Sequence, residues 1–118
     1  MFPKEKLDKY IKYFKEEQQT YYTIERGYIS YDETINTFIK DFYKYDMIDI
    51  DYMDNIHPYI EKKINLQDII KNADISMIKS ILTFYIRGDR FNEGMIAEAI
   101  DKEIFLKSLM KLNNIQEN

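Results

Sequence analysis

The feature that most constrains this chain is a run of apolar residues at helical spacing within residues 74–90. They recur every three or four positions and so share one face of a helix: Ile78, Ile81, Leu82, Tyr85 and Ile86. Asp74 precedes them as a good N-cap residue, and Gly88 with Asp89 marks the end of the helix and a new cap. We predict that this helix is the central and most buried element of the fold.

Weaker amphipathic patterns flank this helix in residues 3–18, 33–45, 53–60, 95–100 and 105–112. Ser30 and Glu33 have capping-box spacing ahead of the second of these segments. A short apolar segment lies near residues 66–70, and the tail of residues 113–118 is expected to fray. The sequence therefore predicts an all-α fold, a compact bundle of five or six short helices.

Residues 20–31 break the helical period. Two runs rich in Tyr, Thr and Ile flank Arg26 and Gly27, a pattern that fits a short β-hairpin. An extended aromatic loop fits the same residues, because the chain uses isoleucine throughout and has no valine, which weakens an argument from β-propensity. Both interpretations stay open, with a slight preference for the loop.

Length and composition place the whole chain, residues 1–118, in a single domain. With 118 residues, 45% hydrophobic and 32% charged, the chain is long enough for one core and leaves little room for a second. No apolar run approaches the roughly 20 residues of a membrane span, and the first residues lack the apolar stretch of a signal peptide. Because the chain also has no cysteine, we expect a cytoplasmic protein that does not associate with a membrane.

The charge balance argues against nucleic acid as a partner. The net charge is −4, whereas nucleic-acid binding usually requires a concentrated basic face. The lysines of the first segment are interleaved with Asp8, Glu16 and Glu17, as on a solvated helix face. We therefore expect the partner to be another protein or a second copy of the chain.

The residue inventory gives no support to a catalytic, metal or cofactor site. A zinc site needs about three or four ligands, and the chain has no cysteine and a single histidine, His57. Asp49, Asp51 and Asp54 lack the central glycine and the correctly placed glutamate of a calcium loop. The three glycines form no glycine-rich phosphate loop. We predict no catalytic residue, no metal and no cofactor.

The segment of residues 85–94 resembles the signature of an uncharacterised bacterial family of small proteins, a domain of unknown function. The signature is Arg-x-x-Arg-Phe-x-Glu-Gly, and the matching residues are Arg87, Arg90, Phe91, Glu93 and Gly94. Tyr28 and Tyr31 resemble a Tyr-x-x-Tyr-Asp pattern of the same family, and the resemblance covers residues 28–112. Asn92 stands where members often have cysteine, so a thiol-based role does not apply here. The resemblance implies no known activity.

Arg87, Arg90 and Glu93 are the candidate ligand-binding residues. Two guanidinium groups at this spacing, beside the start of a helix, suit a phosphate or a carboxylate. The alternative is that the arginines pair with nearby carboxylates and tie two helices together. If the helix continues, Arg90 lies on the inward face of Ile86, and we therefore predict that Arg90 is covered and paired while Arg87 is more exposed.

Phe91, Gly94 and Asp89 are the structural candidates of the same segment. In the structural interpretation Phe91 is a plug in the core and Gly94 allows two elements to pack closely. Asp89 is expected to cap the next helix or to pair with an arginine.

Two classes of function remain. The first is a protein-binding or regulatory module without catalytic activity, which the small size and the 11 tyrosines favour. The second is a binder of a small anion or nucleotide, or an enzyme, that would use Arg87, Arg90 and Glu93 and would need an open cleft beside them. The first class is favoured by elimination, and the sequence leaves the molecular function unknown.

Overall fold

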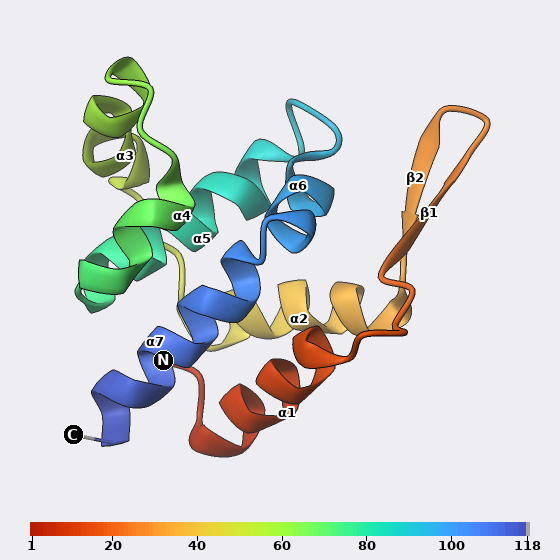
Figure 1. Ribbon diagram of the computed structural model, residues 1–118, viewed down its shortest axis with the longest axis horizontal. Helices are drawn as coiled ribbons and strands as arrows, with labels where there is room; N and C mark the ends of the chain where they lie inside the picture. Colours follow the sequence, from red (N-terminus) through yellow and green to blue (C-terminus); the bar gives the residue numbers. More distant parts are fainter. Residues whose placement is uncertain (118) are drawn as a thin grey trace.

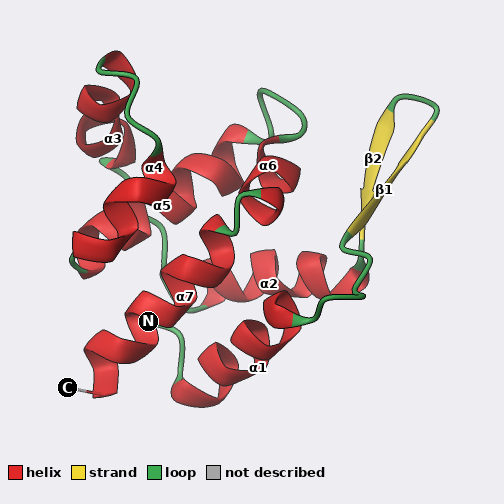
Figure 2. Ribbon diagram, in the orientation of Figure 1, coloured by secondary structure: helices red, strands yellow, loops and turns green. Residues whose placement is uncertain are grey.

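The computed structural model describes residues 1–117 and is built mainly from helices (Figures 1 and 2). In chain order the elements are α1 (Lys4–Lys15), β1 (Tyr22–Glu25), β2 (Tyr28–Tyr31), α2 (Glu33–Lys44), α3 (Tyr52–Glu61), α4 (Leu66–Ile69), a 3-10 turn (Ile70–Asn72), α5 (Ile75–Gly88), α6 (Met95–Asp101) and α7 (Ile104–Glu117). Figure 1 shows α1, α2 and α7 close together, α3 at the other end, α4 between α3 and α7, and the hairpin of β1 and β2 projecting from the body. Within the described residues, no helix is long and apolar enough to cross a membrane.

The central position of α5 is confirmed. Its predicted inward residues are all buried: Ile78, Ile81, Leu82, Tyr85 and Ile86. The helix starts at Asp74, whose carboxylate accepts a hydrogen bond from the backbone N–H of Met77 at 2.8 Å. Because α5 packs against α3, α6 and α7, burial of this face holds both ends of the molecule together.

An aromatic cluster fills the space between α1, α2 and α7. Phe14, Phe38 and Phe105 come from these three helices, with ring centroids 5.4, 5.7 and 5.2 Å apart. Phe2 stacks on Phe38 at 5.9 Å and closes the cluster from the N-terminal side. Tilted and edge-on aromatic pairs of this kind add to the stabilisation that comes from buried area alone.

The buried hydroxyl of Tyr10 is satisfied within this part of the core. It donates a hydrogen bond to the carboxylate of Asp41, which also lies 3.4 Å from Lys6 Nζ. Burial and this hydrogen bond raise the pKa of Tyr10 far above its ordinary value. Burial by itself raises the pKa of Asp41, but the hydrogen bonds from Tyr10 and Lys6 outweigh it, and the net effect is a lowered pKa.

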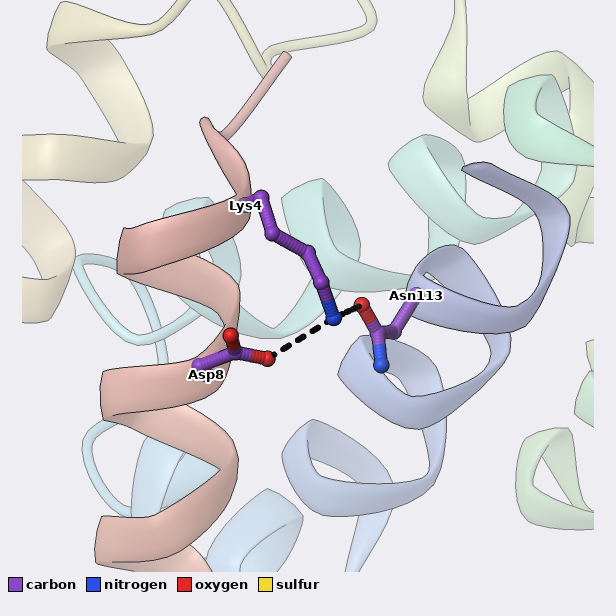
Figure 3. Close-up of polar contacts among 3 residues, drawn as sticks. All are labelled: Lys4, Asp8 and Asn113. Carbon is purple, nitrogen blue, oxygen red and sulfur yellow. Dashed lines mark hydrogen bonds and ion pairs between the residues drawn. The ribbon is translucent and has the colours of Figure 1, made fainter. Parts of the chain in front are cut away.

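A polar contact joins the outer sides of α1 and α7 (Figure 3). Lys4 Nζ donates to Asp8 at 3.1 Å within α1 and to the side-chain oxygen of Asn113 at 2.9 Å on α7. All of these groups are exposed to solvent, so the contact fixes the relative position of two helices more than it stabilises them.

Residues 22–31 form a β-hairpin, so the prediction of a purely helical fold is wrong, and so is the preference for a loop in residues 20–31. The two strands pair antiparallel, from Tyr22 opposite Tyr31 to Glu25 opposite Tyr28. Arg26 and Gly27 form the turn with φ values of 52° and 82°, as in a two-residue turn of type I′. A left-handed arginine costs roughly 1–2 kcal/mol and is not the usual residue of such a turn, which makes the sequence signal weak.

The helices differ from the predicted ones in four places. The first helix is predicted to reach residue 18, but α1 ends at Lys15. Ser30 lies in β2 and caps no helix; α2 begins after Asp32, whose carboxylate accepts a hydrogen bond from the Tyr13 hydroxyl at 2.7 Å. The short apolar segment near residue 66 forms the additional helix α4, which makes seven α-helices in the described residues. Fraying was expected from residue 113, but α7 continues as a helix through Glu117, and residue 118 lies outside the described residues.

Candidate functional site

The loop of residues 89–94, between α5 and α6, is organised by the carboxylate of Asp89. Its Oδ1 accepts hydrogen bonds from the backbone N–H groups of Gly94 and Ile96, both at 3.0 Å. Ile96 lies in the first turn of α6, so Asp89 caps this helix from outside it. Gly94 has a φ of 104°, which L-amino acids with side chains rarely adopt, and this explains the glycine at the start of α6. Asp89 is not the N-cap residue that was predicted, because Gly94 holds that position and Asp89 follows the end of α5, but its carboxylate does accept the N–H groups at the start of α6.

The same loop is fastened to the hairpin. Glu93 Oε1 accepts a hydrogen bond from the backbone N–H of Ile29 at 3.0 Å. Hydrogen-bonded and non-hydrogen-bonded residue pairs alternate along an antiparallel ladder. The N–H of Asp32 bonds to the carbonyl of Tyr21, so these two residues form a hydrogen-bonded pair. Ile29 is three positions before Asp32 and is therefore in a non-hydrogen-bonded pair, in which its N–H points away from β1. Glu93 therefore closes part of the outer edge of β2. The side chain of Ile29 also reaches Gly94, where an added Cβ would lie 3.6 Å from it.

Two tyrosines of the hairpin extend this contact to α6. The hydroxyl of Tyr31 donates to Asp89 Oδ1 at 3.3 Å and accepts from the backbone N–H of Ala97 at 3.2 Å. The hydroxyl of Tyr22 donates to the carboxylate of Asp101 at 2.8 Å. Burial, together with the nearby charge of Asp89, raises the pKa of Tyr31 well above its ordinary value. These hydroxyls are used inside the molecule and are not free for a partner.

The prediction for Arg90 is wrong. Arg90 is exposed, Arg87 is half-buried, and within the described residues neither arginine has a carboxylate oxygen within 4.0 Å. The guanidinium of Arg90 lies over the ring of Tyr43, 5.6 Å from its centroid. The reason is a turn after α5, where the N–H of Phe91 bonds to the carbonyl of Gly88, so Arg90 does not continue the inward face of the helix.

The prediction that Phe91 plugs the core is also wrong. Its side chain is 85% exposed, the largest exposure among the large hydrophobic residues that the structure describes. Ile24 and Tyr28 of the neighbouring hairpin are exposed as well. Glu93 thus bonds the loop to the hairpin, and the side chain of Phe91 on the same loop is exposed to solvent.

A second aspartate, Asp49, has a role that the sequence did not indicate. Its carboxylate accepts hydrogen bonds from Ser80 Oγ, from Asn55 Nδ2 at 3.1 Å and from the backbone N–H of Asp51 at 3.0 Å. Its own N–H donates to Thr83 Oγ1 at 3.1 Å. Burial by itself raises the pKa of Asp49, but these donors outweigh it and lower the pKa. Asp49 therefore joins α3 to α5. The sequence feature that could have indicated this role is the presence of two polar residues, Ser80 and Thr83, inside an otherwise apolar helix.

Metal-ligating side chains do not gather in the part of the chain that the structure describes: it brings no three His, Cys, Asp or Glu residues together in a way that could hold an ion. His57 is exposed, and its Nε2 lies 3.2 Å from Glu61 on the next turn of α3.

Two hollows of the described surface lie away from the arginines. One, of about 290 Å³, is lined by residues of α3, α4 and α5 that include Ile60, Leu66 and Phe84, and by Lys102 just after α6. Another, of about 490 Å³, lies between α4 and α7 and is lined by Lys71, Lys107 and other residues. Neither hollow includes Arg87, Arg90 or Glu93 in its lining, so the structure does not bring these three residues together in either cleft.

Comparison with known proteins adds a family and no activity. No curated protein and no solved structure is detectably similar to the chain. The model of one family, described as a family of unknown function (DUF6508), matches residues 4–118, which is nearly the entire chain. The chain therefore belongs to this family of unknown function.

Proposed function

We propose that this chain is a cytoplasmic protein-binding module without catalytic activity, and that it contacts its partner through the hairpin–loop surface. This surface consists of the exposed side chains of Ile24 and Arg26 on the hairpin and of Arg90 and Phe91 on the loop. Tyr28 is also exposed, but it points to the opposite face of the hairpin and is not part of the surface. The observation that carries the proposal is the exposure of Phe91 on an ordered loop. That the loop sequence is the shared signature of a bacterial family is part of the same proposal.

The order of the loop separates Phe91 from an ordinary exposed side chain. Single exposed apolar residues are common on proteins and need no explanation. Phe91, however, sits on a loop whose backbone is held by Asp89 and Gly94 and which is bonded to the hairpin through Glu93. A partner that binds a pre-ordered ring loses less conformational entropy than one that must order a mobile loop.

The charged residues of the surface indicate the chemistry of the partner. All three arginines of the chain, Arg26, Arg87 and Arg90, lie in the hairpin turn or beside the loop. Arginine and aromatic residues are enriched among the residues that dominate binding energy at protein interfaces. The surface therefore suits a protein segment that offers apolar side chains flanked by carboxylates.

A second candidate function is the binding of a small anion by Arg87 and Arg90. One observation favours it: neither guanidinium is paired with a carboxylate among the described residues. Glu93 would not take part, because its carboxylate is already engaged with the backbone of Ile29.

The test compares Phe91→Asp with Met110→Asp, a substitution on α7 outside the surface. Both tagged full-length variants and the wild type are used to capture proteins from cells that make the chain natively, and each captured partner is then titrated in purified form by calorimetry. We expect a partner that binds the wild type and Met110→Asp but loses at least tenfold in affinity for Phe91→Asp.

Equal binding by all three proteins would contradict the proposal. Inorganic phosphate is titrated in parallel into the wild type and into Arg87→Ala and Arg90→Ala. Phosphate binding that both arginine variants lose, without any effect of Phe91→Asp on a protein partner, would favour the anion site instead.

A further inference from the structure

A row of partly exposed apolar side chains runs along α3 and forms an apolar stripe on the surface. Ile56 of this helix faces the core and is fully buried, whereas Met53 and Ile60 are 46% and 42% exposed. Ile50, 81% exposed, precedes the helix, and Ile64, 39% exposed, follows it. Met53 and Ile60 lie three and four positions from Ile56, so the exposed residues border the side of α3 that packs on α5. Ile60 and Ile64 also line a hollow together with Phe84 of α5.

The spacing of these residues places them along one line. Positions 50, 53, 57, 60 and 64 succeed one another by three or four residues, about one residue per helical turn. Ile64 lies just beyond the end of the helix, where its N–H bonds to the carbonyl of Tyr59 at 2.9 Å and keeps the chain against the last turn. The exposed apolar residues are thus a continuous stripe, with His57 at its centre.

The spacing of the apolar residues along the stripe is nearly the same in both chain directions from its centre. From His57, apolar residues lie four and seven positions back, at Met53 and Ile50, and three and seven positions forward, at Ile60 and Ile64. In an antiparallel pair of α3 helices that cross at His57, Ile50 of each copy therefore lies near Ile64 of the other, and Met53 near Ile60. A twofold interface requires a patch that is complementary to itself in this way.

Charge at the two ends of the stripe favours the same arrangement. The exposed carboxylates of Asp51 and Asp54 lie at the N-terminal end of α3, and the exposed Lys62 and Lys63 follow its C-terminal end. An antiparallel pair brings the acidic end of each copy to the basic end of the other, twice by symmetry, while a parallel pair places like charges together. Glu61 is the exception at the basic end, and it is already paired with His57.

We propose that the apolar stripe along α3 is a self-association surface on which a second copy of this chain docks antiparallel through its own α3. The surface is separate from the hairpin–loop surface, so both can be occupied at once. Because the stripe is only about three helical turns long, the interface belongs to the small class, below about 1,200 Å² in total, and the dimer is weak and reversible.

The first test is sedimentation velocity on the full-length chain over a wide concentration series. We expect a shift from monomer to dimer for the wild type, and monomer at every concentration for Met53→Asp and for Ile60→Asp. Met110→Asp is the matched control, since Met110 is 39% exposed but lies on α7, and it should dimerise as the wild type does. Far-UV circular dichroism checks that every variant is folded, which the exposure of these side chains favours.

The second test uses charge reversal to address the antiparallel geometry. Asp51→Lys with Asp54→Lys makes both ends of α3 basic, and Lys62→Glu with Lys63→Glu makes both ends acidic. Each double variant should stay monomeric alone, and an equimolar mixture of the two should form a heterodimer at least as well as the wild type forms a homodimer.

A wild-type chain that stays monomeric at all concentrations would overturn the proposal, as would dimers that Met53→Asp and Ile60→Asp leave intact. If the stripe variants abolish the dimer but the mixture of charge variants fails to associate, the antiparallel arrangement is wrong. Neither result affects the hairpin–loop surface, whose test rests on Phe91.

Discussion

Two loops of this protein are each held in place by hydrogen bonds to the carboxylate of one aspartate. Residues 45–51 lead into α3 and are organised by Asp49; residues 89–94 lead into α6 and are organised by Asp89. Each carboxylate accepts hydrogen bonds from its own loop and from a distant element. Each loop also displays one highly exposed apolar side chain, Ile50 at 81% and Phe91 at 85%.

The difference lies in what each aspartate is bonded to. Asp49 is bonded to Ser80 and Asn55, so it ties its loop to α5 and α3 in the body of the molecule. Asp89 is bonded to the start of α6 and to Tyr31 of the projecting hairpin. The comparison shows that a short carboxylate, which accepts several donors at once, can either fasten the body or build a projecting surface.

Replacing Asp49 should have the largest effect. Asp49→Ala leaves the buried hydroxyl of Ser80 and the amide of Asn55 without this acceptor, and we expect a loss of about 2–3 kcal/mol in the free energy of unfolding. Urea unfolding followed by circular dichroism measures it. A loss below about 0.5 kcal/mol would mean that the Asp49 contacts contribute no more than a surface group does.

Replacing Asp89 should cost less and act locally. Asp89→Ala removes the cap of α6 and the link to Tyr31, for which we expect about 1–2 kcal/mol. Amide hydrogen exchange should speed up at the start of α6 and in β2, with little change in α3. A uniform increase across the whole chain would show that Asp89, too, supports the body of the fold.

Acid should weaken the contribution of Asp49 to stability. The donors around Asp49 lower its pKa in the folded chain, so its contribution to stability is present above the pKa of an unfolded aspartate, about 3.9, and is lost as the pH falls through the lower folded value. Asp49→Asn should therefore lose less stability than the wild type between pH 7 and pH 3. Parallel pH profiles for the two proteins would contradict this account; Asp41, whose pKa is also lowered, is unchanged in both.

Arg90 should contribute little to stability. Its one described contact is with the ring of Tyr43, and an exposed cation–π contact is worth about 0.5–1 kcal/mol. We expect Arg90→Ala to reduce the free energy of unfolding by about 0.5 kcal/mol, measured by urea unfolding. A loss of several kilocalories would restore the prediction of a structural, paired arginine.

The smallest effect is expected at the two displayed residues. Phe91→Ala and Ile50→Ala should each change the free energy of unfolding by less than about 0.5 kcal/mol, because both side chains are mostly in water. Their effects on association should differ: Phe91→Ala weakens binding of a protein partner, and Ile50→Ala weakens the dimer through α3. A strong destabilisation by Phe91→Ala would show that its ring packs on the protein in solution.

Much of the helical framework could be predicted from the sequence, because a helix places residues three and four positions apart on one side. The buried face of α5 and its cap at Asp74 depend only on such short intervals, and both are confirmed. The hairpin could not be predicted in this way. Its turn uses Arg26 in a left-handed conformation, and two short strands are marginal by themselves without the contacts that Tyr22 and Tyr31 make to the body.

The sequence by itself determined the mostly helical class and the central helix. Only the tertiary structure decided what the residues of the loop 89–94 do, because their partners lie far away in the chain: Glu93 bonds to Ile29, and Asp89 to Tyr31. Extending the helix beyond Gly88 predicts that Arg90 faces inward, and Phe91 was expected in the core as well. The turn after Gly88 leaves both side chains exposed, because spacing along the sequence does not specify where a helix gives way to a turn.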